Sequence, residues 1–184
     1  MKNWVAGSVI ALALTSATFA QEGEQSENRV NAETDWSVFV EDEPTQCWVV
    51  SAPRETVNTR DGRVVAVRRG DILMFVSFWP TENRMGEVTF TGGYPFAEDS
   101  TVTVQIGDAE FELFTQNVRN EQGESVGWAW AASEQDDQRI ITAMKRGAEA
   151  VLTARSSRGT QTVDTFSLLG FTAAVEDAET RCGG

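Results

Sequence analysis

Short runs of β-branched and aromatic residues, separated by turn residues, are the feature that most limits how this chain can fold. About ten such runs follow one another from Trp36 to Leu168. Residues 101–106 alternate apolar and polar side chains, and Gly107-Asp108 then leads into the next run, which is typical of a β-hairpin. The pattern predicts a mostly β protein, an antiparallel β-sandwich of about ten short strands.

The expected strands cover residues 36–40, 47–51, 63–68, 72–79, 87–91, 101–106, 109–114, 127–131, 150–156 and 162–168. Residues 72–79 are almost continuously apolar, which predicts a central strand that is buried on both faces. The loop between residues 117 and 125 is polar and is expected to be exposed.

One or two helices are expected to pack on the sandwich. Ser133 is a good N-cap with Asp136 three residues later, and Gly147 is placed to end this helix. A second helix is expected over residues 171–181, where apolar side chains recur at helical spacing. Cys182 continues the apolar face of that helix, which would carry the cysteine toward the core.

The N-terminus indicates export. Lys2 is the only charge in the first 20 residues, an apolar run follows it, and small residues precede Gln21. This order predicts a signal peptide over residues 1–20 that is cleaved after Ala20. The apolar run is too short to span a bilayer, and no other apolar stretch approaches that length, so no integral membrane span is expected after cleavage. Residues 21–34 are expected to form a disordered acidic lead-in, and residues 35–184 a single β-sandwich domain.

Composition excludes several functions. Without Lys2 the chain has 28 acidic and 14 basic residues, so nucleic acid is not an expected partner. The chain contains no histidine and only two cysteines, which removes His-based catalysis and the usual zinc motifs. We therefore expect no enzyme activity, no metal and no cofactor. In an exported protein the even pair predicts a Cys47–Cys182 disulfide.

Two groups of residues are candidates for contact with a partner. Trp128 and Trp130 share one face of a strand and could form an aromatic platform, although the alternative for the tryptophans is packing between sheets. Arg155, Ser156, Ser157 and Arg158 join two strands and could form a contact surface for an acidic or phosphorylated group. In the alternative, Arg155 pairs with Asp164 and only fixes the register of a hairpin.

Several motifs occur in the order found in a known family. They are segments 35–38, 47–53, 92–95, 143–147, 154–160 and 164–174, followed by Cys182. Together they resemble the invasion-associated locus B family. The resemblance implies an envelope protein that Gram-negative bacteria, chiefly alphaproteobacteria, export to the periplasm or the outer membrane. It supplies no catalytic residues.

The leading hypothesis is a non-enzymatic cell-envelope protein that binds another envelope component, a protein or a glycan. The alternative is a carbohydrate-binding or carbohydrate-active β-sandwich protein, which aligned, solvent-exposed tryptophans would favour. A third possibility, a carrier of a small apolar ligand, would need a cavity between the sheets.

Overall fold

The computed structural model describes residues 28–43 and 45–182, so the expected signal peptide and the first part of the acidic lead-in lie outside the described residues. The described chain is mostly strand. The strands are β1 Arg29–Glu33, β2 Trp36–Asp42, β3 Thr45–Ser51, β4 Glu55–Arg60, β5 Arg63–Val64, β6 Leu73–Trp79, β7 Arg84–Thr91, β8 Thr101–Ile106, β9 Ala109–Arg119, β10 Ser125–Trp130, β11 Glu149–Arg155 and β12 Gln161–Ser167. The helices are η1 Pro80–Glu82, a short 3-10 turn, and α1 Glu134–Met144 and α2 Phe171–Cys182.

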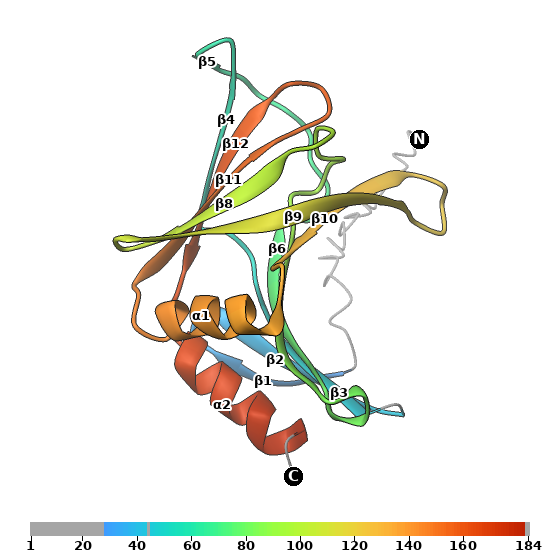
Figure 1. The fold of residues 1–184 in the computed structure, drawn as a ribbon, viewed down its shortest axis with the longest axis vertical. Coiled ribbons are helices and arrows are strands. Elements are labelled where there is room, and N and C mark those ends of the chain that lie inside the picture. Colours follow the sequence, from blue (N-terminus) through green and yellow to red (C-terminus); the bar gives the residue numbers. More distant parts are fainter. Residues whose placement is uncertain (1–27, 44, 183–184) are drawn as a thin grey trace, which may run out of the picture.

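The described strands form one hydrogen-bonded sheet in the order β1-β2-β3-β6-β7-β10-β9-β8-β11-β12-β4-β5. All paired strands are antiparallel. The long strand β9 and its partner β10 cross the middle of the molecule, with β4, β8, β11 and β12 on one side and β1, β2, β3, β6 and β7 on the other (Figure 1).

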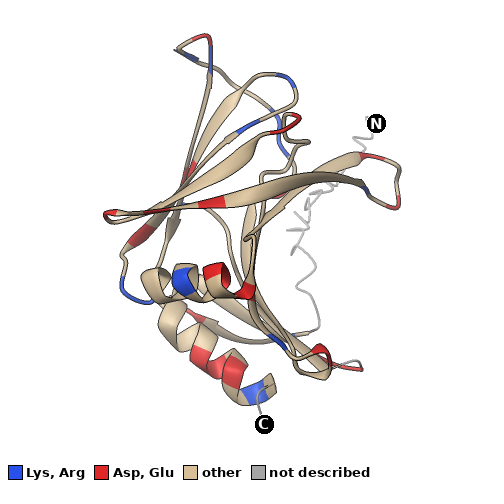
Figure 2. Ribbon diagram, in the orientation of Figure 1, with Lys and Arg blue, Asp and Glu red and all other residues tan. Residues whose placement is uncertain are grey.

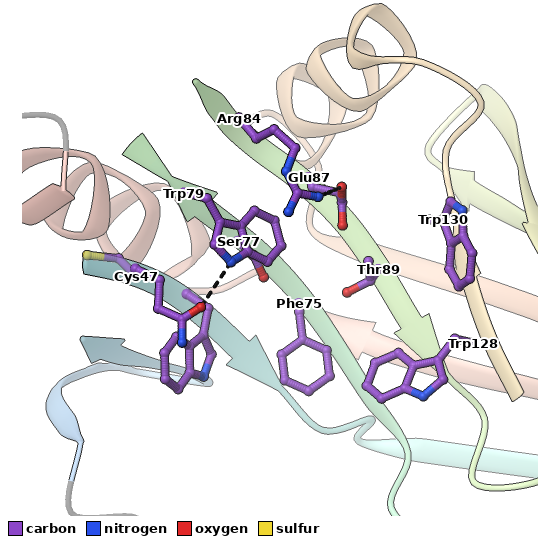
Figure 3. Close-up of a pocket in the computed structure, with 11 residues that line it drawn as sticks. Cys47, Phe75, Ser77, Trp79, Arg84, Glu87, Thr89, Trp128 and Trp130 are labelled. Carbon is purple, nitrogen blue, oxygen red and sulfur yellow. Dashed lines mark hydrogen bonds and ion pairs between the residues drawn. The ribbon is translucent and has the colours of Figure 1, made fainter. Parts of the chain in front are cut away.

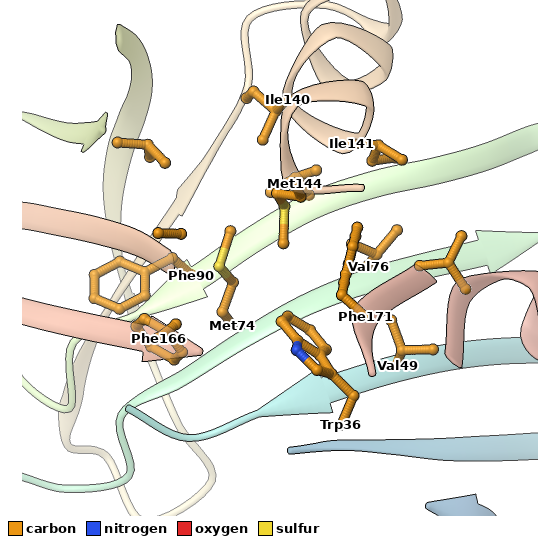
Figure 4. Packing of buried hydrophobic residues seen from close by; sticks show 14 of the residues in the cluster. Trp36, Val49, Met74, Val76, Phe90, Ile140, Ile141, Met144, Phe166 and Phe171 are labelled. Carbon is orange, nitrogen blue, oxygen red and sulfur yellow. The ribbon is translucent and has the colours of Figure 1, made fainter. Parts of the chain in front are cut away.

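The two halves of the sheet meet around one core. The indole N–H of Trp36 in β2 donates to the backbone carbonyl of Ser167 at the end of β12, 3.0 Å away. The ring of Phe90 in β7 lies 6.1 Å from that of Phe166 in β12, and Figure 4 shows both with Met74 in this layer. The single sheet therefore makes a sandwich-like arrangement, which confirms the predicted mostly β, antiparallel class.

Both predicted helices are present, and both cover the same face of the sheet. Ser133 is the N-cap of α1, and its hydroxyl accepts a hydrogen bond from the backbone N–H of Asp136. Helix α1 contacts β7, and α2 contacts β2, β3 and β6. Cys182 ends α2 and is bonded to Cys47 of β3, as predicted.

The open sheet face, defined here as the face opposite α1 and α2, differs from the prediction. Residues 72–79 were expected to be buried on both faces. In β6 only Met74, Val76 and Phe78 are buried, whereas the alternate residues are partly exposed. The apolar run is continuous because the open face also carries large apolar side chains.

Strand boundaries required three other corrections. The expected strand over residues 63–68 shrinks to the two-residue β5, because most of this segment is exposed and only Arg63 and Val64 pair with β4. Strand β4 was not expected, since its sequence Glu55–Arg60 is polar. Residues 29–33, expected to be part of a disordered lead-in, form the edge strand β1, which pairs with β2. Among the described residues, no helix combines the length and apolar character needed to cross a membrane.

Candidate functional site

An aromatic groove lies on the open face, across strands β3, β6, β7 and β10. Its aromatic walls are Trp48, Phe75, Trp79, Trp128 and Trp130, and the polar side chains Gln46, Ser77, Arg84, Glu87 and Thr89 also line it. The volume is about 600 Å³, which is in the range of small-ligand sites. Figure 3 shows the rings of Phe75, Trp128 and Trp130 around Thr89.

The groove follows from the order of side-chain sizes across the sheet. In one cross-strand row the small Ser77 lies between Trp48 and Glu87. In the next row Thr89 lies between Phe75 and Trp130. Because cross-strand neighbours stand side by side, a short side chain between two large ones leaves a depression. The backbone register therefore determines the floor and the walls.

One wall of the groove is held by polar contacts. The indole N–H of Trp79 donates to Oε1 of Gln46 at 2.9 Å. The guanidinium carbon of Arg84 lies 4.1 Å from the centre of the Trp79 ring, in a cation–π contact. Arg84 also forms an ion pair with Glu87 at 2.9 Å. These contacts fix the Trp79 ring and the single carboxylate among the residues that line the groove.

Other polar groups of the groove remain available to a ligand. Within the described part of the chain, the hydroxyls of Ser77 and Thr89 and the indole N–H groups of Trp48, Trp128 and Trp130 make no hydrogen bond to protein. Buried indole N–H groups normally have a partner, as that of Trp36 does. The unpaired groups in the groove instead face solvent.

The tryptophans divide into two groups. Trp36 is 1% exposed and packs edge-on against Phe171 in the core. The other four tryptophans of the described chain are partly exposed and line the groove, so the interpretation of all of them as packing between sheets is wrong. Trp128 and Trp130 do share a strand face, and the structure adds Trp48 and Trp79 to them. The sequence does contain a pattern that predicts the exposure of Trp48. Trp48 directly follows Cys47 in a strand, and successive side chains of a strand point to opposite faces. Because Cys47 points into the core to form its disulfide, Trp48 must lie on the other face.

A second hollow, the arginine cleft, adjoins the groove. Its volume is about 990 Å³, and its lining includes Arg60, Arg68, Arg69, Arg158 and Trp128. Trp128 thus lies at the junction of the two hollows. Figure 2 shows basic residues at this end of the molecule, near the β4–β5 and β11–β12 turns, whereas acidic residues predominate on α2.

The base of the arginine cleft is a buried ion pair. Two guanidinium nitrogens of Arg69 donate to the two carboxylate oxygens of Asp164, at 2.7 and 2.6 Å, and the side chains are 6% and 0% exposed. Arg69 also donates to the backbone carbonyl of Gly92 and lies over the ring of Tyr94. Burial raises the pKa of Asp164, although the hydrogen bonds from Arg69 oppose that shift. The pair ties the segment before β6 to β12.

Only some residues of the predicted contact surface at 155–158 lie together in the structure. Ser156, Ser157 and Arg158 line the arginine cleft, whereas Arg155 does not. Ser156 is buried and its hydroxyl accepts a hydrogen bond from the backbone N–H of Thr160, so it serves the turn. The alternative pairing of Arg155 with Asp164 is wrong, because Asp164 is bonded to Arg69 and Arg155 lies opposite Gln161. Sequence reasoning missed Arg60, Arg68 and Arg69, which are distant from residue 158 along the chain.

The fold and the two hollows define a class: a disulfide-closed, antiparallel β protein with two helices on one sheet face and an open aromatic groove on the other. Residues 36–179 match the family model described as "Invasion associated locus B (IalB) protein". The chain therefore belongs to the IalB family.

A solved structure supports the same fold. The crystal structure of invasion associated protein B from Bartonella henselae is similar with a TM-score of 0.52 and 15% sequence identity, over 82% of this chain and 95% of that chain. At this identity the likeness concerns the fold. No curated protein matches the chain.

Proposed function

We propose that this chain is an exported, non-catalytic protein of the bacterial cell envelope that binds another envelope component through the aromatic groove. The observation that carries the proposal is the set of four partly exposed tryptophans around a floor of unpaired hydroxyls. Aromatic rings bury large areas in a defined geometry, and free polar groups between them can orient a ligand.

Location in the periplasm or at the outer membrane rests on the sequence of residues 1–20 and on membership of the family. The disulfide suits an oxidising compartment. N-terminal analysis of protein from the envelope fraction should find a chain that begins at Gln21 or within a few residues of it. A chain that retains Met1 in the membrane would contradict the proposed export.

Absence of catalysis is supported by the residue types of the chain and of the groove. The sequence contains no histidine, which removes the commonest general base. Glu87 is the one carboxylate among the residues that line the groove, and it is paired with Arg84. Hydrolysis of a glycosidic bond normally requires two carboxyl groups on either side of that bond. The groove therefore favours the binding form of the carbohydrate alternative over the hydrolytic one.

The binding proposal can be tested by site-specific photo-crosslinking in intact cells. A benzophenone amino acid at position 128 or 48 lies in the groove, and the same group at Ala173 is an exposed control on α2, on the helix-covered side. We expect discrete crosslinked species from positions 128 and 48 and none of the same species from position 173. Equal products from all three positions, or none from the groove, would contradict the proposal.

A further inference from the structure

The aromatic groove and the arginine cleft form one connected binding surface. Trp128 lines both hollows, and Leu73 and Thr91 line the cleft directly beside it. In the sheet register Trp128 is paired with Thr91, and Thr91 with Leu73. A ligand longer than one hollow can therefore extend from the rings of the groove past Trp128 to the arginines.

The chemistry of the groove suits sugar rings. A pyranose presents an apolar C–H face that can lie on an indole ring, and hydroxyls at its edge that need donors and acceptors. Ser77 and Thr89 offer free hydroxyls, and Glu87 offers a carboxylate beside the ring of Trp79. A purely apolar ligand would leave the hydroxyls of Ser77 and Thr89 without partners, which is costly.

The chemistry of the cleft suits an anion. Arg60, Arg68 and Arg158 are exposed, and within the described residues none of the three forms an ion pair. Two acids, Asp71 and Glu124, also line the cleft, and Asp164 neutralises Arg69. The lining is therefore net positive on a chain whose formal net charge is −13. Guanidinium groups bind carboxylates and phosphates in a bidentate geometry.

The arginines are attached to a fixed framework. Arg68 directly precedes Arg69, whose guanidinium is held by Asp164, Asn58 and the Gly92 carbonyl. The backbone N–H of Gly70 donates to the carbonyl of Gly93, 2.8 Å away. Gly93 has a φ of +71°, and a Cβ there would lie 2.4 Å from the Gly70 oxygen, so this contact requires glycine. The Arg60 guanidinium donates to the Thr160 hydroxyl at 2.6 Å.

We infer that the ligand of this surface is an anionic polysaccharide. Its sugar rings stack on the aromatic groove, and its acidic groups, carboxylate or phosphate, bind Arg68 and Arg158 in the cleft. The inference rests on the proposed function of the groove and names the class of its ligand.

The test is a titration of the mature chain with three polymers: polygalacturonate, which carries carboxylates, a phosphate-substituted mannan, and neutral dextran. The variants are Arg68→Gln with Arg158→Gln, and Trp128→Ala. The matched control is Arg146→Gln, which removes a charge at an exposed position that lines neither hollow. Circular dichroism and melting curves of each variant verify folding.

We expect at least one anionic polymer to bind, with affinity that falls about tenfold or more in the double arginine variant and in Trp128→Ala, and that stays unchanged in Arg146→Gln. Binding should weaken as salt rises, because exposed charges are screened. The two anionic polymers distinguish a carboxylate-bearing from a phosphate-bearing ligand.

Two outcomes would overturn the inference. The first is binding of dextran as strong as that of the anionic polymers, with no effect of the double arginine variant. The second is no binding of any polymer. If crosslinks from positions 128 and 48 persist in the second case, the groove binds a partner of another class, such as a protein, and the proposed function stands. If they are also absent, both proposals fail.

Discussion

Arg69 and Asp164 form a buried ion pair at the base of the arginine cleft. Replacing Asp164 with Asn leaves the Arg69 guanidinium buried without a counter-charge. Because an uncompensated buried charge is strongly unfavourable, Asp164→Asn should lower the free energy of unfolding by about 3–5 kcal/mol. The matched control is Asp35→Asn, which removes the exposed ion pair with Arg54 and should change stability little.

Urea denaturation of the two variants measures this difference. The double variant Arg69→Met with Asp164→Leu should recover most of the lost stability, because it removes both charges together. Equal effects of Asp164→Asn and Asp35→Asn would contradict a structural role of the buried pair.

Asp137 should make stability depend on pH. It is 7% exposed at the start of α1 and accepts a hydrogen bond from the backbone N–H of Val88. Burial, helped by nearby acidic residues, raises its pKa from 3.8 to about 6. The folded state then binds this proton more tightly than the unfolded state does. Protonated Asp137 therefore contributes to the free energy of unfolding below pH 4, and this contribution is lost as pH rises to about 6.

The Asp137→Asn variant keeps an oxygen acceptor for Val88 and cannot ionise. Its stability relative to the natural chain should therefore increase between pH 4 and pH 7, by at most about 3 kcal/mol. Urea midpoints at four pH values in this range measure the change. Parallel stability curves for the two proteins would show that Asp137 does not titrate as described.

At the residue scale, the sequence predicted local interactions better than distant ones. The Ser133 cap depends on residues within one turn and was correctly predicted. Arg69 and Asp164 are 95 positions apart, and nothing local connects them. Their pairing depends on how the segment before β6 lies against β12.

At the element scale, α2 and the disulfide act together. Cys182 ends α2 and fastens it to β3. The bond closes a loop of 135 residues, so Cys182→Ser should lower the free energy of unfolding by about 4–5 kcal/mol in the chain-entropy account. The end of α2 should also exchange its amide hydrogens faster, while α1 serves as the internal control.

Melting curves and hydrogen exchange measure both effects. An unchanged melting temperature, or loss of protection in α1 equal to that in α2, would contradict a local anchoring role. Thiol titration of the denatured, unreduced natural chain should find no free thiol.

Elements with a strong periodic pattern were predictable, and elements that depend on neighbours were not. The helices at 134–144 and 171–182 have apolar faces of their own, and the first also has the Ser133 cap. Strand β4 is polar and extends the sheet only because β12 offers it an edge. Residues 63–68 have the sequence pattern of a strand, but only Arg63 and Val64 pair with another strand, β4.

At the scale of the whole molecule, the binding surface results from covering only one sheet face. The helices and the disulfide lie on one face, which leaves the aromatic residues of β3, β6 and β10 that line the groove open. The sequence identified Trp128 and Trp130 because they share one strand. It did not predict that Trp48 and Trp79 lie beside them. These residues are on other strands, and the order of strands in a sheet depends on contacts between distant parts of the chain.

The central claim is that the open face, through its tryptophans, is the binding surface. The most direct measurement is a nitrogen–proton NMR titration of the indole groups in the chain from Gln21 onward, with solubilised envelope components added stepwise. The signals of Trp48, Trp79, Trp128 and Trp130 should shift or broaden. The signal of Trp36, whose N–H is hydrogen-bonded to the Ser167 carbonyl in the core, should keep its position and line width. Unchanged groove signals, or a shift of Trp36 equal to theirs, would contradict the claim.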